Sequence, residues 1–84
     1  MKTQYDKIKE NHPDCVILFR KKDFYVLYED DAVIASRDLG ITLSKRDDYK
    51  TACFPFHALD DYLPRLIRNG HRVCITDEID YDIR

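Results

Sequence analysis

Two apolar segments joined by a charged turn, CVILF-RKKD-FYVLY, run from Cys15 to Tyr28. The first, Cys15–Phe19, is a continuous apolar run with β-branched members and predicts a buried strand. The second, Phe24–Tyr28, predicts another strand, and the short polar turn between them favours an antiparallel hairpin. Every residue of the second segment is apolar or aromatic, so we expect both of its faces to be covered or one face to bind a partner.

Helical patterns surround this hairpin. A first short helix is expected from Thr3 to Asn11, ended by the proline that follows. Glu29-Asp30-Asp31 opens a second helix, because acidic residues in a first turn complement the helix dipole. Gly40 is well placed to end that helix in the left-handed conformation. A third helix runs from about Ala58 to Asn69, and Pro64 inside it should bend it or cost stability.

Three further strands complete the pattern. We expect them at Ile41–Ser44, Thr51–Phe54 and Arg72–Thr76, with residues 45–50 as the loop or hairpin between the first two. The order α, β-hairpin, α, β-hairpin, α, β predicts an α+β fold, a single mixed β-sheet with flanking helices. The residues expected in its core are Val16, Leu18, Leu43, Leu63, Leu66, Val73 and Ile75.

The length of 84 residues allows a single domain, residues 1–84, with an acidic tail from about residue 77. Apolar residues make up 44% and charged residues 36%, which is typical of a globular chain. The longest apolar run, Cys15–Phe19, is too short to span a bilayer, and the N-terminus has no apolar signal core. We therefore expect a cytoplasmic protein that does not bind membranes.

The charge is unevenly distributed. The chain carries a net charge of −2, but residues 1–22 carry +3 and residues 23–31 carry −4. This distribution allows a locally basic face without implying a strong general affinity for phosphate.

The residue types that carry catalysis or bind metals show no familiar arrangement. Cys15, Cys53 and Cys74 are widely spaced among apolar neighbours, which predicts reduced cysteines in the core. No cysteine pair has metal-ligand spacing, and the histidines are scattered, so we expect no metal and no cofactor. There is no GxSxG motif, no glycine-rich phosphate loop and no Cys-His pair at a suggestive spacing. We therefore expect that the chain is not an enzyme.

Several short motifs, in order from about residue 4 to residue 78, together resemble one known family. Gln4-Tyr5 leads to His12-Pro13, and Leu18-Phe19-Arg20 is followed by Asp23-Phe24-Tyr25. Further along stand LGITLSKR at residues 39–46, ACFPFHA at residues 52–58 and GHRVCI at residues 70–75. Together they resemble the N-terminal domain, domain I, of MutS-type DNA mismatch repair proteins. The resemblance implies the domain I fold, and it includes none of that family's ATPase machinery.

The resemblance also implies a way of binding DNA. In MutS proteins the Phe of a Phe-x-Glu motif enters the minor groove and stacks on a mismatched base, and the Glu hydrogen-bonds to that base. Unstacking costs a few kcal/mol, and the cost is smallest where pairing is already poor. Phe24 occupies the wedge position, but Val26 stands where the family has Glu and cannot hydrogen-bond to a base. Lys22 stands where the family has Gly, so a turn that favours positive φ must accept a side chain.

Two hypotheses follow. The first is a small DNA-binding module for mismatched or flexible double-stranded DNA. The residues expected to contact DNA are Phe24, Arg20, Lys21, Lys22, Val26, Lys45 and Arg46. The second is a protein-interaction or regulatory module that kept the fold and lost base recognition. Phe24 and the basic turn favour the first, whereas Val26 and the net acidic charge favour the second.

Overall fold

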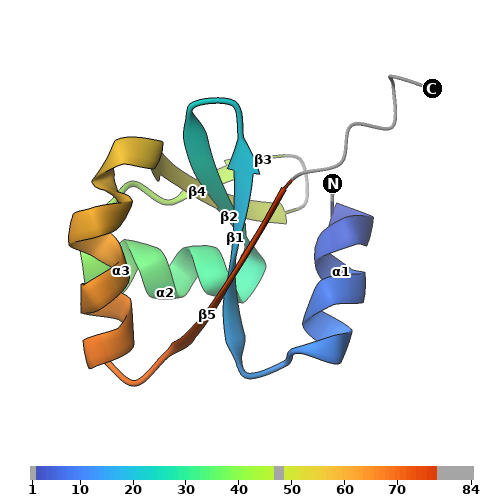
Figure 1. Ribbon diagram of the computed structural model, residues 1–84. Coiled ribbons are helices and arrows are strands. Elements are labelled where there is room, and N and C mark those ends of the chain that lie inside the picture. Colours follow the sequence, from blue (N-terminus) through green and yellow to red (C-terminus); the bar gives the residue numbers. More distant parts are fainter. Residues whose placement is uncertain (1, 47–48, 78–84) are drawn as a thin grey trace.

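The chain folds around one mixed sheet, seen in a computed structural model that describes residues 2–46 and 49–77 (Figure 1). The elements, in chain order, are α1 (Lys2–Asn11), β1 (Cys15–Lys21), β2 (Phe24–Tyr28), α2 (Glu29–Leu39), β3 (Ser44–Arg46), β4 (Tyr49–Pro55), the 3-10 turn η1 (Phe56–Ala58), α3 (Leu59–Arg68) and β5 (Arg72–Asp77). The predicted α+β class and element order are confirmed. The tail predicted after residue 77 lies outside the described residues.

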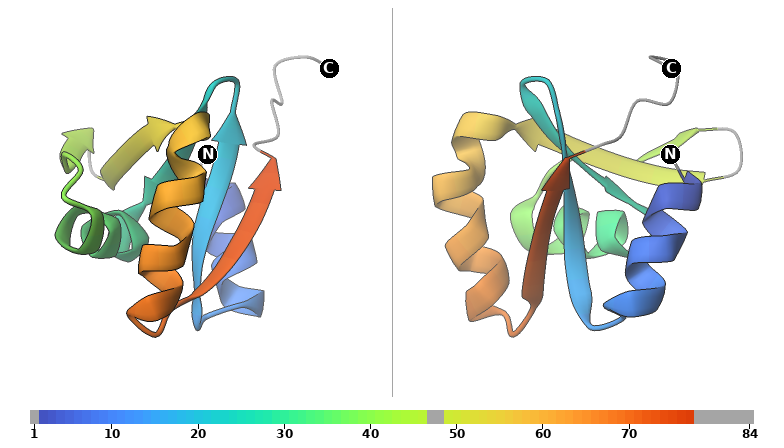
Figure 2. Two further views of the ribbon diagram at one scale, coloured as in Figure 1. Left: turned by 60° about the vertical axis from the view of Figure 1, so that its left-hand side comes forward. Right: turned by 45° about the vertical axis from the view of Figure 1, so that its right-hand side comes forward.

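The strands have the spatial order β3-β4-β2-β1-β5. Neighbouring strands are antiparallel except β1 and β5, which are parallel. α1 lies on one face of the sheet, and α2 and α3 lie on the other (Figure 2). The predicted hairpin, β1–β2, therefore forms the middle of the sheet and is covered from both sides. None of the helices among the described residues is long and apolar enough to cross a membrane.

The core has two parts because the sheet is covered on both faces. The larger part lies against α2 and α3 and consists of Val16, Leu18, Tyr25, Leu27, Ala32, Ala35, Leu39, Ala52, Phe54 and Leu66. The smaller part lies beneath α1 and consists of Tyr5, Ile17, Phe19 and Tyr28. Side chains alternate between the faces of a strand, so the continuous apolar run Cys15–Phe19 supplies both parts.

Two residues predicted in the core are exposed. Val16, Leu18 and Leu66 are buried and Leu63 and Val73 half-buried, but Leu43 is 40% exposed and Ile75 is 48% exposed. Ile75 lies on the edge strand β5, at the margin of the layer that α2 and α3 cover.

The strand predicted at Ile41–Ser44 was also misplaced, since β3 begins only at Ser44. Gly40 ends α2 in the left-handed conformation, as predicted, with φ of 74°. Residues 41–43 then connect the helix to the edge of the sheet. Lys45 and Arg46, predicted in a loop, are therefore strand residues, and Leu43 is left on the connecting segment.

Buried polar contacts fix α1 to the sheet. The Asp31 side chain is fully buried, and its carboxylate lies 2.9 Å from Lys9 Nζ and accepts a 3.1 Å hydrogen bond from the Ile17 amide. The Tyr5 hydroxyl also hydrogen-bonds to Asp31. Burial, followed by the charge of Asp31, raises the pKa of Tyr5 well above its usual range. Gln4 Nε2 donates to the Asp77 carbonyl at 3.2 Å, which joins α1 to the end of β5.

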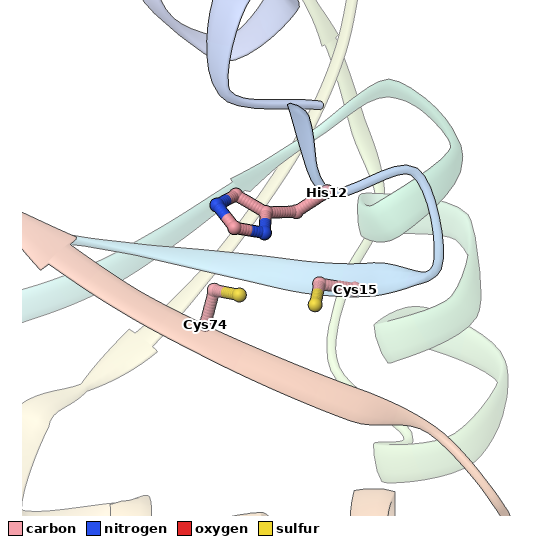
Figure 3. Close-up of side chains that lie close together, drawn as sticks. All are labelled: His12, Cys15 and Cys74. Carbon is pink, nitrogen blue, oxygen red and sulfur yellow. The ribbon is translucent and has the colours of Figure 1, made fainter. Parts of the chain in front are cut away.

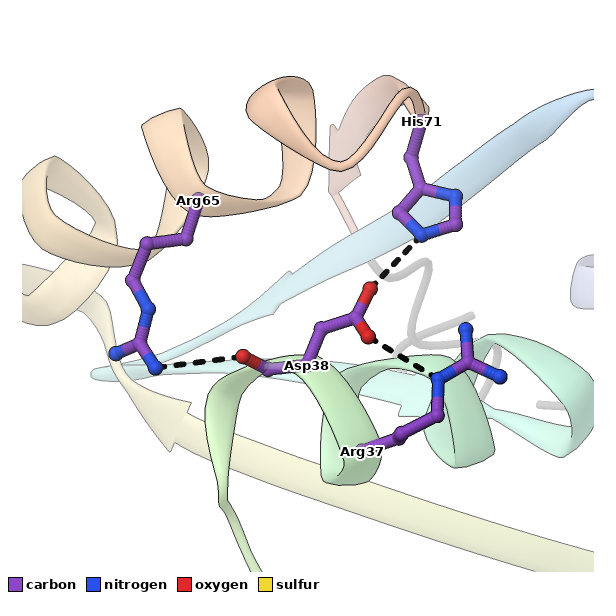
Figure 4. Close-up of polar contacts among 4 residues, drawn as sticks. All are labelled: Arg37, Asp38, Arg65 and His71. Carbon is purple, nitrogen blue, oxygen red and sulfur yellow. Dashed lines mark hydrogen bonds and ion pairs between the residues drawn. The ribbon is translucent and has the colours of Figure 1, made fainter.

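A second polar group joins the end of α2 to α3 and β5 (Figure 4). The Asp38 carboxylate lies 2.9 Å from His71 Nε2 and 3.1 Å from Arg37 Nε, and the Asp38 carbonyl accepts a 3.3 Å hydrogen bond from Arg65. Burial alone would raise the pKa of Asp38. Hydrogen bonds from Arg37, His71 and Asn69 outweigh burial and lower that pKa below its usual value.

Candidate nucleic-acid interface

Phe24 lies at the tip of the central hairpin, where its side chain is 47% exposed. It is the first residue of β2 and pairs with Lys21 of β1 on one side and Pro55 of β4 on the other. Paired residues of antiparallel strands point to the same face of a sheet. Lys21, Phe24 and Pro55 therefore share one face, while the next residue, Tyr25, points to the other face and is buried. An aromatic ring is thus presented at the end of the strand in the middle of the sheet.

The turn that precedes Phe24 is shorter than predicted. β1 continues through Lys21, so only Lys22 and Asp23 form the turn. Lys22 has φ of 56°, the left-handed conformation that glycine adopts most readily, as the sequence led us to expect. Lys21 and Lys22 are both exposed. Two exposed lysines therefore adjoin Phe24 along the chain and in the strand pairing at the hairpin tip.

Arg20 lies on the opposite face of the sheet from Phe24, because it pairs with Tyr25. Its guanidinium carbon is 4.4 Å from the ring centroid of Phe56 and 5.7 Å from that of Tyr25. Its Nε donates a 2.6 Å hydrogen bond to the Lys22 carbonyl, and the Phe56 amide donates a 2.8 Å bond to the Asp23 carbonyl. These contacts support the hairpin turn from the face opposite Phe24.

Val26 shares the face of Phe24, two residues further along β2, a spacing of roughly 7 Å. It is half-buried against the core beneath α1 and pairs with Cys53 of β4. Beside it lies a pocket of about 270 Å³, whose lining includes Lys21, Tyr49 and Thr51. An aliphatic side chain therefore lines the pocket next to the exposed ring.

Lys45 and Arg46 lie away from Phe24. On β3 they pair with Lys50 and Tyr49, at the end of β4 nearer Tyr28 than Phe24. Phe24 and Tyr28 are the two ends of β2, roughly 13 Å apart along the strand. The structure thus brings Phe24, Lys21, Lys22 and Val26 together, and places Arg20 on the other face and Lys45 and Arg46 at the far end of the sheet.

Sequence reasoning missed one group of side chains elsewhere. The ligand atoms of His12, Cys15 and Cys74 all lie within 4.8 Å of one another. A hydrogen bond to Cys15, and then burial, raise the pKa of the Cys74 thiol. The sequence shows no Cys-His pair typical of an enzyme motif, but His12 and Cys15 do form an H-x-x-C pair. That spacing was the one sequence signal for this group of side chains.

These features define a small α+β domain whose central hairpin presents an exposed aromatic ring flanked by lysines. The MutS domain I family model matches residues 1–82, and the chain belongs to this family.

Bacterial proteins named DNA mismatch repair protein MutS are similar to the chain. The protein from Phocaeicola vulgatus is 49% identical over 95% of this chain and 10% of its own length. Those from Salinibacter ruber and Bacteroides thetaiotaomicron are each 52% identical, over 92% and 95% of this chain and 9% and 10% of their own lengths. The chain therefore spans about a tenth of the length of these relatives.

Proposed function

We propose that this chain binds mismatched or otherwise distorted double-stranded DNA, with Phe24 as a wedge in the minor groove. The observation that carries the proposal is the exposure of Phe24 at the tip of the central hairpin, beside two exposed lysines. Similarity to proteins named for DNA mismatch repair supports the same function.

The wedge would work by replacing one stacking interaction with another. Opening a base step costs a few kcal/mol, and a mismatch or bulge has already lost part of that stacking. A base that stacks on an aromatic ring regains about 1–3 kcal/mol. Lys21 and Lys22 flank the ring and would neutralise phosphates on either side of the groove.

Val26 determines how the chain would distinguish mismatched or bulged DNA from matched DNA. Its aliphatic side chain can neither accept nor donate a hydrogen bond, so the base beside Phe24 would not be identified by its polar edge. Selection would then depend on how easily the step unstacks, and bulges and mismatches at flexible steps would be preferred. With few basic contacts, the affinity should be micromolar or weaker near physiological salt.

The other basic residues would have different roles. Arg20 stacks on Phe56 and would mainly hold the hairpin in shape. Lys45 and Arg46 belong to strand β3 near the Tyr28 end of β2, so any contribution they make to DNA binding would be separate from the wedge. We further propose that DNA binding requires no ATP and that the chain is not itself an enzyme. Residues 1–84 would act as one domain, and the protein would work in the cytoplasm.

A second function is favoured by one observation. Val26 and the adjoining pocket of about 270 Å³, which Lys21 and Thr51 also line, give the face of Phe24 a mixed apolar and polar hollow that would suit a protein side chain. In that case Phe24 would anchor a protein partner, and the chain would be an interaction module.

Binding to short duplexes distinguishes the two functions. Fluorescence anisotropy at low salt would compare matched, mismatched and single-base-bulged DNA for the native chain, Phe24→Ala and a control, Ile67→Ala. Ile67 is also an exposed apolar residue, 57% exposed, but it lies on α3. We expect the native chain and the control to prefer the bulge by a small factor and Phe24→Ala to lose the preference. Absence of binding to the bulged duplex at high protein concentration would refute the DNA function.

A further inference from the structure

Three side chains that commonly bind metals come together beneath the C-terminal end of α1 (Figure 3). In the parallel pairing of β1 and β5, Cys15 pairs with Arg72 and Ile17 pairs with Cys74. Cys15 and Cys74 therefore lie two pairs apart in the register, with Val16 and Val73 between them, and on the same face of the sheet. His12, which follows α1, points toward both thiols in Figure 3. Its imidazole and the two sulfur atoms lie within 4.8 Å of one another.

The backbone fixes two of the three side chains relative to each other. The Cys15 amide donates a 3.1 Å hydrogen bond to the His12 carbonyl, and the His12 amide donates a 2.9 Å bond to Ile8. His12-Pro13-Asp14-Cys15 is thus a closed turn that continues from α1. Ligands separated by two residues in a tight turn are usual in zinc sites, where the spacing lets both side chains reach one ion. The third side chain, from β5, is fixed by the sheet register.

The surroundings suit a positive ion bound by thiolates. Lys9 Nζ donates to the Cys15 carbonyl and forms an ion pair with Asp31, so both charges next to the thiols are already paired. His12 is exposed, and Cys15 and Cys74 are partly exposed, so an ion can enter from solvent.

We propose that His12, Cys15 and Cys74 form a binding site for a thiophilic d10 metal ion such as Zn²⁺. Two thiolates and one imidazole would fill three tetrahedral positions and leave the fourth to water. At the tetrahedral angle, Zn–S bonds of about 2.3 Å and a Zn–N bond of about 2.0 Å require S···S of about 3.8 Å and N···S of about 3.5 Å. Because the three ligand atoms lie within 4.8 Å of one another, each pair would need to approach by at most about 1.3 Å to reach this geometry. Binding releases the thiol protons, and the two thiolates balance the charge of the ion.

Such a site would join the end of α1 to the edge strand β5. Cys15 and Lys21 are the two ends of β1, roughly 20 Å apart. The site lies on the same face of the sheet as Phe24 but at the opposite end of β1. The metal would therefore act on the stability of the sheet edge rather than on the hairpin tip, and the proposal is independent of DNA binding.

Metal titration of the reduced full chain tests the proposal. Zn²⁺ affinity is measured against a chromophoric chelator, and Co²⁺ or Cd²⁺ gives a thiolate charge-transfer absorption that reports sulfur ligands. The variants are His12→Ala, Cys15→Ser and Cys74→Ser, with Cys53→Ser as the matched control. Cys53 is the third cysteine, exposed on β4 and outside the cluster. Circular dichroism checks folding, and His12→Ala changes only an exposed turn residue.

We expect one Zn²⁺ per chain, a charge-transfer band and a higher melting temperature with metal. Each ligand variant should weaken binding by roughly a hundredfold, because one of three protein ligands is lost, while Cys53→Ser binds as the native chain does. Failure of the reduced native chain to bind, or affinity unchanged in folded His12→Ala and Cys74→Ser, would overturn the site. Oxidation of the reduced chain to a Cys15–Cys74 disulfide, with no metal uptake beforehand, would overturn it in favour of a redox pair.

Discussion

Arg20 and Phe56 are in contact across the intervening strand β2, with the guanidinium carbon 4.4 Å from the ring centroid. Phe56 directly follows Pro55, which pairs with Phe24 on the other face. The last residue of β4 and the first residue of η1 therefore hold the hairpin tip, Pro55 beside the exposed ring and Phe56 on the opposite face. The position of Phe24 depends on this contact as well as on its own strand.

Phe56→Ala should loosen the hairpin without removing any group from the face of Phe24. A cation–π contact at an exposed site is worth about 0.5–1 kcal/mol, so the loss of global stability should be small. We expect faster amide hydrogen exchange at Lys22 and Asp23 and a weaker preference for bulged DNA. Unchanged exchange at the turn would show that Arg20 and Phe56 do not support it.

Lys21→Ala combined with Lys22→Ala should weaken binding to matched and bulged duplexes by the same factor. Phosphate contacts carry no sequence information, and each one lost reduces the salt dependence of binding by about one unit of slope. Arg68→Ala is the control, because Arg68 is an exposed basic residue on α3, on the face of the sheet opposite Phe24. A double variant that loses only the bulge preference would contradict the assignment of these lysines to phosphates.

Val26→Glu should increase discrimination between mismatched and matched DNA, because a carboxylate two residues from the wedge could accept a hydrogen bond from a displaced base. The same change places a charge at a half-buried position and should lower stability, so melting must be measured alongside anisotropy. Val26→Ala controls for loss of the valine packing. Equal discrimination in both variants would mean that this position does not face the base.

Leu66→Ala should cost about 2–5 kcal/mol, because the side chain is completely buried between α3 and the sheet. The neighbouring Ile67 is 57% exposed, and Ile67→Ala should change stability by about 0.5 kcal/mol or less. Urea unfolding of both variants measures the difference. Similar losses in the two would mean that α3 presents a different face to the core.

Asp38→Asn should remove part of the acid sensitivity of the fold. The pKa of Asp38 is lower in the folded chain than in the unfolded chain, where it is about 3.9. The ionised carboxylate therefore stabilises the fold at pH values above about 3.9. This stabilisation is lost as the pH falls through the pKa of the folded chain. The variant should be less stable at neutral pH, and its stability should fall less than that of the native chain below about pH 4. Thermal melts from pH 7 to pH 2 would measure this, and parallel curves would contradict it.

Local patterns predicted most of the fold. The limits of β2, the left-handed Gly40 and the order of elements all follow from runs of apolar residues and from turn residues between them. β3 was misplaced because its position depends on pairing with β4, which no local pattern encodes. Ile75 was misassigned because its exposure depends on lying at the sheet edge, and strand order is a property of the whole chain.

In the candidate site, too, features marked by a local motif could be predicted, and features that depend on strand pairing could not. Phe24 could be chosen from the sequence because a motif marks it. The face on which Arg20 lies could not be predicted, because the sequence suggested a turn of four residues and the structure has a turn of two. The length of the turn determines which strand residues pair and therefore which side chains share a face. The group of His12, Cys15 and Cys74 needed the parallel register of β1 and β5, two segments at opposite ends of the sequence.

The parallel pairing of β1 with β5 also determines when the fold can be completed. β1 emerges from the ribosome early, yet one of its two edges is covered only when Arg72–Asp77 has been synthesised. Until then the nascent chain holds its most apolar strand with an uncovered backbone edge, the kind of edge that pairs with other chains. Pairing with Arg72–Asp77 therefore moves the open edge of the sheet from the apolar β1 to β5, which is shorter and more polar.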